Sequence, residues 1–304
     1  MISIVIPCHN EEPVLDALMA RLAPVLEALG EHELVFVDDG SGDGTLAKLE
    51  KYARANPSVK VISFSRNFGH QAAISAGIEH SSGDCVVTMD ADLQDPPEVI
   101  PSMVEKWREG FQLVYGYRVS RGKDTPFKSL TAKLFYWLMK ALSGVEVPRD
   151  SGDFRLMDRA LADQVKGLRE HHRMLRIFTA WTGFRSTGVP YERGDRVAGQ
   201  TKYTLGRMIR FAWDGITSFS YWPLQMATWL GLASALLAFA GIVWVIIVKA
   251  AGWAIPGWTS LATLVLFIGG IQLLVLGVIG EYLGRIYDEV RARPLYIVAK
   301  RINF

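Results

Sequence analysis

The sequence predicts an α/β domain with a mainly parallel sheet, followed by a hairpin of two membrane-spanning helices. Short apolar runs alternate with helical patterns in the first part of the chain, at intervals of roughly 25 residues, as in sheets whose faces are covered by helices. Further on, residues 221–248 and 258–280 contain no charged residue. Each of these stretches is long enough for the ~20 apolar residues that a helix needs to cross a bilayer.

Four apolar runs are expected to form strands of the α/β domain, which we place at residues 1–203. They are ISIVIP (2–7), ELVFVDD (33–39), KVISFS (60–65) and DCVVTMDAD (84–92). Each run ends in polar residues, among them His9, Asp39, Arg66 and Asp90. Because ligands bind beyond the carboxyl ends of the strands in open α/β sheets, the sequence predicts a polar binding site at one edge.

Composition and short motifs argue against several classes of protein. With 33 basic and 31 acidic residues the formal charge is only +2, which gives nucleic-acid binding little support. The stretch from Gly40 to Gly44 has neither the spacing of a dinucleotide-binding loop nor the lysine of a P-loop. Cys8 and Cys85 lie in apolar runs, where we expect buried free thiols. The first residues carry no basic segment before their apolar run, so no signal peptide is expected.

Asp90, Ala91 and Asp92 come at the end of the fourth apolar run. Carboxylate oxygens suit a hard divalent cation, Mg²⁺ or Mn²⁺, which fills its remaining positions with substrate phosphates. Two carboxylates here would bridge a metal to a diphosphate. The same spacing also occurs in solvated acidic turns, and by itself it does not separate these two interpretations.

The charges beside the two uncharged stretches predict their orientation. Basic residues lie on the outer sides of the pair: Arg207, Arg210, Arg285, Arg291 and Arg293. The loop between the stretches carries only Lys249. The positive-inside rule therefore predicts an inner (plasma) membrane protein with its α/β domain and both termini in the cytoplasm, residues 281–304 being a cytoplasmic tail. The alternative is a pair of buried core helices.

Two amphipathic stretches are expected to link the α/β domain to the bilayer. Residues 126–144 place Phe135, Leu138 and Leu142 on one helical face, and residues 204–220 mix arginines with apolar side chains directly before the first span. Such helices can lie in the membrane interface, or they can pack on a protein core. Lying in the interface, they would present a lipid headgroup to the domain while its tail stays in the membrane.

Six motifs, taken in order and spacing, carry a resemblance to a known family. They are VIPCHNEE, FVDDGSGDGT, SRNFGHQAAISAGI, MDADLQDPPEVIP, GYRVSR and SGDFRLMDR. The chain resembles the family 2 glycosyltransferases of GT-A fold, and among them the polyprenyl-phosphate glycosyltransferases, which include the dolichyl-phosphate mannose synthases. The C-terminal GEYLGRIYDEVRARPLYIV looks like the bactoprenol glucosyltransferase branch in particular.

The resemblance implies a role for particular residues. A nucleotide-sugar donor would contact Pro7, His9, Glu11, Val37, Asp39, Asp90, Ala91, Asp92, Gln94, Arg118, Arg196 and Lys202. Within this set, the metal ligands would be Asp90, Asp92 and Gln94, while Arg118, Arg196 and Lys202 would reach the phosphates. Many relatives carry an aromatic residue at the position of His9. The three basic residues could also be solvated surface charges.

The implied reaction is an inverting transfer of a hexose to a polyprenyl phosphate, with Asp92 and Asp153 as catalytic residues. The catalyst must stabilise the charge that develops on the departing diphosphate, which a metal and fixed cations do. A phosphate acceptor has a second pKa near 6 and is largely doubly ionised at neutral pH, so it needs little help from a base. We therefore hypothesise that Asp153 mainly orients the acceptor or the sugar. Helix capping or an ion pair is the alternative for Asp153.

Two other functions and several other sugar donors are alternatives to transfer of glucose to a polyprenyl phosphate. A processive polysaccharide synthase of the same fold would be expected to show a Q-x-x-R-W motif, where residues 173–181 read RMLRIFTAW. A membrane scaffold would not be obliged to keep Asp90, Asp92 and Asp153 together. UDP-glucose and undecaprenyl phosphate are the first choice of substrates, and galactose, N-acetylhexosamine, aminoarabinose and GDP-mannose donors stay open. Relatives suggest a homotetramer.

Overall fold

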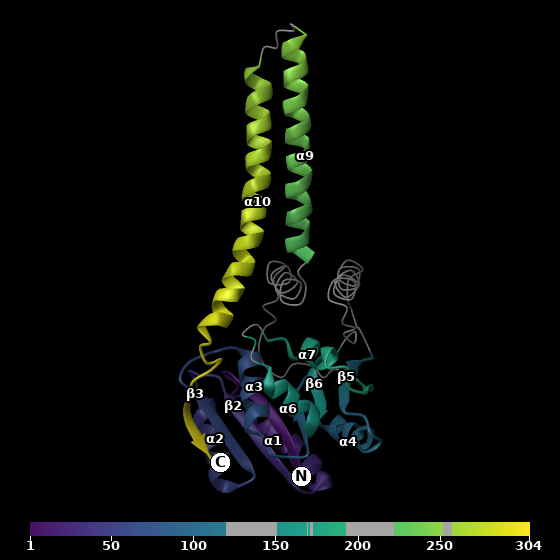
Figure 1. Cartoon of the computed structure of the whole chain (residues 1–304). Coiled ribbons are helices and arrows are strands. Elements are labelled where there is room, and N and C mark those ends of the chain that lie inside the picture. Colours follow the sequence, from purple (N-terminus) through teal and green to yellow (C-terminus); the bar gives the residue numbers. More distant parts are fainter. Residues whose placement is uncertain (120–150, 169, 171–172, 193–221, 252–256) are drawn as a thin grey trace. The chain divides into compact units, whose positions relative to one another are not determined.

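The computed structural model describes residues 1–119, 151–168, 170, 173–192, 222–251 and 257–304 (Figure 1). The chain divides into two compact units, one formed by Met1–Met208 with Pro294–Phe304 and the other by Ile209–Arg293. The two predicted amphipathic stretches, at 126–144 and 204–220, lie outside the described residues. The same is true of the predicted phosphate-binding residues Arg196 and Lys202.

The first unit is built on a sheet of eight strands in the order β7-β5-β6-β4-β1-β2-β3-β8. The central strands run parallel, as predicted. Three pairs of strands are antiparallel: β3 with β8, β4 with β6, and β5 with β6. The strands are β1 (Ile2–Cys8), β2 (His32–Asp38), β3 (Val59–Phe64), β4 (Cys85–Thr88), β5 (Leu113–Arg118), β6 (Ser151–Asp158), β7 (Ser186–Tyr191) and β8 (Val298–Ile302).

Helices cover both faces of this sheet because successive strand residues point to opposite sides. In β1, Ile4 and Ile6 pack with one set of helices, and Val5 packs with the other. The first face holds α1 (Leu15–Leu29), α2 (Thr45–Ala55) and α4 (Ile100–Arg108), the last preceded by the short η1 (Pro97–Val99). The second face holds α3 (His70–His80), α6 (Arg159–Gly167) and α7 (Leu175–Trp181). Gly77 lets α3 approach β1 closely, since a Cβ there would collide with Val5.

Strand order places a crevice at the centre of the sheet. Strand β1 lies between β2 and β4 and runs parallel to both. The connection from β1 to β2 crosses one face through α1, whereas the connection from β3 to β4 crosses the other through α3. The chain thus changes the face on which it crosses the sheet between β2–β3 and β3–β4, with β1 at the centre, and such switch points are where open sheets bind ligands.

The predicted C-terminal tail contains an edge strand. Strand β8 pairs antiparallel with β3, and the side-chain amide of Asn303 donates to the carbonyls of Ala53 and Val59 at 2.7 and 2.8 Å. Lys300 forms an ion pair of 2.7 Å with Glu50 in α2. The last residues of the chain are thus part of the α/β unit.

The second unit contains two long apolar helices, α9 (Trp222–Ala250) and α10 (Trp258–Arg291), which contact each other. Both are long and apolar enough to cross a membrane. Large apolar side chains on them are exposed, among them Trp229, Phe239, Leu273 and Leu276. Protein burial therefore does not account for their hydrophobicity, which disfavours the alternative of core helices within the described chain. Helix α10 continues past residue 280, where the second uncharged stretch ends.

Candidate active site

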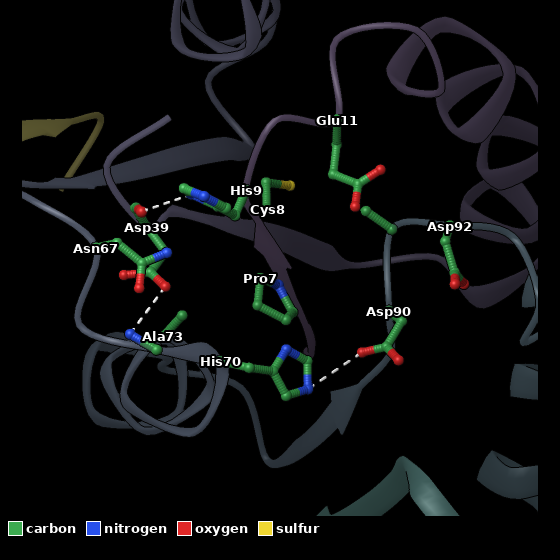
Figure 2. A pocket seen from close by; sticks show the side chains of 12 residues that line it. Pro7, Cys8, His9, Glu11, Asp39, Asn67, His70, Ala73, Asp90 and Asp92 are labelled. Carbon is green, nitrogen blue, oxygen red and sulfur yellow. Dashed lines mark hydrogen bonds and ion pairs between the residues drawn. The ribbon is translucent and has the colours of Figure 1, made fainter. Parts of the chain in front are cut away.

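A pocket of about 340 Å³ lies at the carboxyl edge of β1, β2 and β4 (Figure 2). Seven of the residues predicted to bind the donor line it: Pro7, His9, Glu11, Asp39, Asp90, Ala91 and Asp92. Cys8, Asn67, Gly69, His70 and Ala73 complete the lining. Figure 2 shows Asp39 and Asn67 on one side, Asp90 and Asp92 on the other, and His70 between them.

The side of the pocket near Asp39 is held by hydrogen bonds between loops. The Asp39 carboxylate accepts from the backbone N–H groups of Phe68 and Gly69 at 2.6 and 2.9 Å. The Nδ1 atom of His9 lies 2.9 Å from the Asp39 carbonyl oxygen. Asp39 therefore joins the loop after β2 to the loop after β3, and it positions His9 at the pocket wall.

Two other predicted donor residues occupy different environments. Glu11 extends into the pocket from the loop after β1, on the same side as Asp92 (Figure 2). Val37 is fully buried in β2, where it packs with Val35 and Ile62. Its side chain belongs to the core, and we assign it no direct contact with a ligand.

The aspartate motif lies in the loop after β4, which ends at Thr88. Asp90 keeps 42% of its side-chain surface exposed, whereas Asp92 is 9% exposed. The Asp92 Oδ1 atom accepts a hydrogen bond of 3.1 Å from the Gln94 backbone N–H. Gln94 itself is not among the residues that line the pocket.

Negative charge is concentrated around Asp90. Desolvation by the pocket walls raises its pKa to about 6, and the carboxylates of Asp95, Asp153 and Asp92 act in the same direction against the opposing effect of His70. A carboxylate in this setting is stabilised by an added cation.

His70, at the first position of α3, joins two carboxylates that are distant in sequence. Its Nε2 atom lies 3.4 Å from Asp90 Oδ1 and 3.5 Å from Asp153 Oδ2. Burial acts to lower the pKa of His70, but the hydrogen bond to Asp153 and the two negative charges outweigh it and raise this pKa. The two carboxylates therefore stabilise the charged form of His70, in which Nε2 can donate to either of them.

Asp153 lies in β6 with its side chain 9% exposed and with several partners. Gln71 Nε2 donates to its Oδ2 at 2.9 Å, and Arg176 Nη2 lies 3.7 Å from its Oδ1. Burial alone would raise its pKa, yet the hydrogen bond from His70 and the charges of Arg176 and Arg155 hold this pKa far below the usual range. Asp153 is therefore ionised throughout the neutral range.

Arg118 ends β5 and belongs to a second polar cluster, with Tyr191 and Asp95. Its Nε donates to the Tyr191 hydroxyl at 3.4 Å, and that hydroxyl donates to Asp95 Oδ1 at 2.5 Å. The charges of Asp95 and Asp90 contribute to raising the pKa of Arg118 against the effect of burial. Asp95, only 4% exposed, thus supports the predicted phosphate ligand through Tyr191.

Several residues of the site were not assigned a role from sequence. His70 and Gln71 lie in the NFGHQ portion of a recognised motif, which was the one available signal for them. Arg176 and Tyr191 lie in stretches without such a signal. Arg176 joins the site through its ion pair with Asp153, and Tyr191 through its hydrogen bond to Asp95.

Comparison with known proteins matches this architecture. The family pattern described as Glycosyl transferase family 2 matches residues 3–166, and that described as GtrB C-terminal hairpin matches residues 222–286. The chain belongs to glycosyltransferase family 2, which confirms the family and the GT-A fold inferred from the six motifs. The α/β unit is thus the glycosyltransferase domain.

Individual relatives match along nearly the whole chain. The chain is 47% identical over 300 residues to the uncharacterized glycosyltransferase YkcC of Bacillus subtilis, covering 98% of this chain and 93% of that one. It is 40% identical over 301 residues to the SfII prophage-derived bactoprenol glucosyl transferase of Shigella flexneri, covering 98% and 97%. It is 39% identical over 304 residues to the prophage bactoprenol glucosyl transferase homolog of Escherichia coli, covering 99% of each.

Proposed function

We propose that the protein transfers a hexose from a nucleotide sugar, with UDP-glucose as the first choice, to a polyprenyl phosphate such as undecaprenyl phosphate. The product would be a lipid-linked sugar donor for glycosylation of the cell envelope. The observation that carries the proposal is a polar pocket with two adjacent aspartates in a chain that also has the apolar hairpin. Full-length relatives named as bactoprenol glucosyl transferases support the choice of sugar and acceptor.

The donor set fits a divalent cation, Mg²⁺ or Mn²⁺. Asp90 and Asp92 line one side of the pocket, and burial together with the neighbouring carboxylates raises the pKa of Asp90. Within the described residues, no group of three or more His, Cys, Asp or Glu side chains could hold a metal by itself. A cation held by two carboxylates and completed by substrate phosphates matches this set, and when bound it would neutralise charge on the diphosphate. Gln94 stays a predicted third ligand.

The basic residues predicted to reach the phosphates complete the donor site in this proposal. Of the three predicted phosphate-binding residues, Arg118 alone belongs to the part of the chain that the structure describes, and its guanidinium interacts electrostatically with Asp90. Arg196 and Lys202 keep their role as predictions. In transfer, a phosphate oxygen of the acceptor attacks the anomeric carbon, and the bond from that carbon to the diphosphate oxygen breaks. A single displacement of this kind inverts the configuration at the anomeric carbon, giving a β-linked product from an α-linked donor.

Asp153 acts in this proposal as an orienting group. Its lowered pKa makes it a poor base, and a doubly ionised phosphate acceptor has no proton that must be removed. Its Oδ1 atom is buried and receives no hydrogen bond within the described part of the chain. A sugar hydroxyl could donate to this oxygen, which would fix the sugar for in-line attack.

The proposed setting is the inner (plasma) membrane, with α9 and α10 as the two spans. Residues before and after the hairpin belong to one folded unit, so they lie on the same side of a membrane that the hairpin crosses twice. The positive-inside rule assigns that side to the cytoplasm. The homotetramer suggested by resemblance remains a prediction.

A donor screen tests this proposal. Membranes containing the full-length protein are incubated with undecaprenyl phosphate, Mn²⁺ and one radiolabelled donor at a time, and lipids are then extracted with organic solvent. We expect labelled lipid with UDP-glucose, and none from membranes of the Asp92→Asn variant. A second outcome is labelled lipid with another donor instead: GDP-mannose, UDP-galactose, UDP-N-acetylglucosamine or UDP-aminoarabinose. That result would correct the proposed sugar and support the proposed reaction. No labelled lipid with any of these donors would refute it.

A further inference from the structure

Tyr296 and Ile297, which follow α10 in the chain and precede β8, contact the loop after β3. The backbone N–H of Ser65 donates to the Ile297 carbonyl at 3.0 Å. The Tyr296 ring stacks on Phe64, with ring centroids 4.8 Å apart and planes at 15°. The Tyr296 hydroxyl donates to Glu79 Oε2 in α3 at 2.5 Å. The C-terminal segment therefore supports the start of this loop.

The aromatic contacts continue into the loop. Phe64 meets Phe68 edge to face, with centroids 5.7 Å apart and planes at 90°. The Arg66 guanidinium lies 4.1 Å from the centroid of the Phe68 ring. Phe68 is therefore in contact with a ring that Tyr296 also contacts.

The same loop is also held by Asp39. The carboxylate receives the N–H groups of Phe68 and Gly69. Gly40, which has a φ of +64°, lies so close to the Arg66 backbone that a Cβ there would collide with it. The loop is thus held between the C-terminal segment and the loop after β2, with little room to shift.

This loop forms a wall of the candidate donor pocket. Asn67, Gly69 and His70 all line the pocket, and His70 lies beside Asp90 (Figure 2). A displacement of Phe68 would therefore act on the bonds to Asp39 and on the position of His70.

We propose that Tyr296 is a positioning residue for the donor pocket. Through Phe64 and Phe68 it holds residues Ser65–Gly69 against Asp39, so the segment after the apolar hairpin contributes to binding a nucleoside diphosphate. This inference rests on the proposed function for the identity of the ligand. The support of the loop itself does not depend on that identity.

The test compares substitutions in the full-length protein purified in detergent. Tyr296→Ala removes the ring, Tyr296→Phe keeps the stack but loses the hydroxyl, and Phe304→Ala is the matched control. Phe304 belongs to the same C-terminal segment, but its ring contacts are with His80 and Lys60. Calorimetry measures the Kd for UDP in the presence of Mn²⁺, and steady-state assays give KM for the donor and kcat.

Tyr296→Ala should raise the UDP Kd and the donor KM by about three- to tenfold, the range expected for losing one aromatic pair, while kcat changes less than about twofold. Tyr296→Phe and Phe304→Ala should keep wild-type values. A Tyr296→Ala protein with wild-type Kd and KM would overturn the proposal. So would an equal loss in Phe304→Ala, since that would indicate general weakening of the edge strand.

Hydrogen exchange separates this inference from the choice of ligand. Without any ligand, Tyr296→Ala should speed exchange of the Phe68 and Gly69 amides at least about fivefold, while amides of β1 and β4 keep their protection. Should the wild type fail to bind UDP, the donor assignment is wrong, and exchange alone decides whether Tyr296 positions the loop. If Tyr296→Ala does not fold, Tyr296→Leu must show the same faster exchange. Unchanged exchange in the folded variant contradicts the proposal.

Discussion

Asp90 and Asp153 both lie within 3.5 Å of the same His70 nitrogen, yet their pKa values shift in opposite directions. The pKa of Asp90 rises to about 6, whereas that of Asp153 falls well below the usual range. Asp153 has Arg155 and Arg176 close by, while Asp90 has the carboxylates of Asp92 and Asp95. Two arginines therefore lie near one carboxylate, whereas the other lies among carboxylates with His70 as its cationic neighbour.

In the proposed function this difference separates two tasks, one for Asp90, which lines the pocket, and one for Asp153, which lies beside the pocket residue His70. A group with fixed protein partners has a fixed position, which suits orientation of a substrate. A cluster of neighbouring carboxylates suits recruitment of a metal with its phosphates. His70 connects the two, and we infer that it keeps the metal side and the orienting side at a constant separation.

The largest effect is expected on the metal side. Asp92→Asn removes a charge but keeps the shape, so it should lower the transfer rate at least about 100-fold and abolish Mn²⁺-dependent UDP binding. Lipid labelling and calorimetry measure these losses, and the melting temperature should stay near that of the wild type. Glu98→Gln, at an exposed carboxylate of the same unit paired with Arg21, is the control and should retain activity. Metal-dependent binding that survives in Asp92→Asn would contradict the assignment.

The orienting side should respond differently. Asp153→Asn should lower kcat about 10- to 100-fold through misplacement of the sugar or acceptor, with UDP binding retained. Because the lowered pKa keeps Asp153 ionised at neutral pH, the variant should keep every limb of the rate profile, and a limb that belongs to Asp90 or His70 should move to lower pH, since the Asp153 charge raises both pKa values. Loss of a limb of that profile in the variant, with binding intact, would show that Asp153 is a base.

Glu33, a carboxylate outside the pocket, also has a lowered pKa, and this shift bears on the stability of the folded protein. Glu33, with its side chain 3% exposed, accepts from Lys60 at 2.6 Å and from Ser3 and Ser82. Burial would raise its pKa, but these hydrogen bonds outweigh burial and lower it from 4.5 to about 2. The ionised form thus contributes stability above pH 4.5, about 3 kcal/mol by linkage, which is lost as pH falls toward 2.

Glu33→Gln should therefore lower the free energy of unfolding at neutral pH by about 2 kcal/mol and flatten its dependence on acid. Urea unfolding of the full-length protein in detergent, followed at pH 7 and pH 4, measures both. A variant that loses stability in acid as steeply as the wild type would show that Glu33 is not the group responsible.

The smallest effect is expected at the Arg118 cluster. Tyr191→Phe keeps the edge contact with Phe154 but removes the hydroxyl between Arg118 and Asp95. One such hydrogen bond corresponds to a rise in donor KM of about two- to tenfold. Tyr52→Phe removes the hydrogen bond from Tyr52 in α2 to Asp16 in α1, neither of which lines the pocket, and should leave KM unchanged. Equal KM values in Tyr191→Phe and wild type would exclude support of the donor by this cluster.

The parallel core and much of the pocket were predictable from the sequence because they depend on local patterns. The runs at 2–7, 33–39 and 60–65 coincide with β1, β2 and β3 to within one residue at each end. Their polar ends necessarily meet at one edge of a parallel sheet. Strand β4 is shorter than its run, since the chain leaves the sheet at Thr88 and carries Asp90 and Asp92 in the loop.

The remaining features depend on contacts between distant residues. Strand β8 follows a long apolar helix, and three of its five residues are exposed. Its sequence therefore lacks the apolar pattern of a buried strand, and only its pairing with β3 identifies it as part of the sheet. Asp95 looks like a turn residue because its burial comes from Tyr191, a partner 96 positions away. His70 gains its role through Asp153, and no spacing rule joins these two residues.

Strand β8 also determines when the enzyme domain can be completed. Because it comes after both apolar helices in the chain, a ribosome synthesises the hairpin before the last strand of the sheet exists. Until then β3 is an open edge, and the loop that Tyr296 supports lacks one of its contacts. The order of synthesis therefore places both apolar helices before completion of the sheet, and a newly made chain would gain the last support of the pocket loop only after β8 has been made.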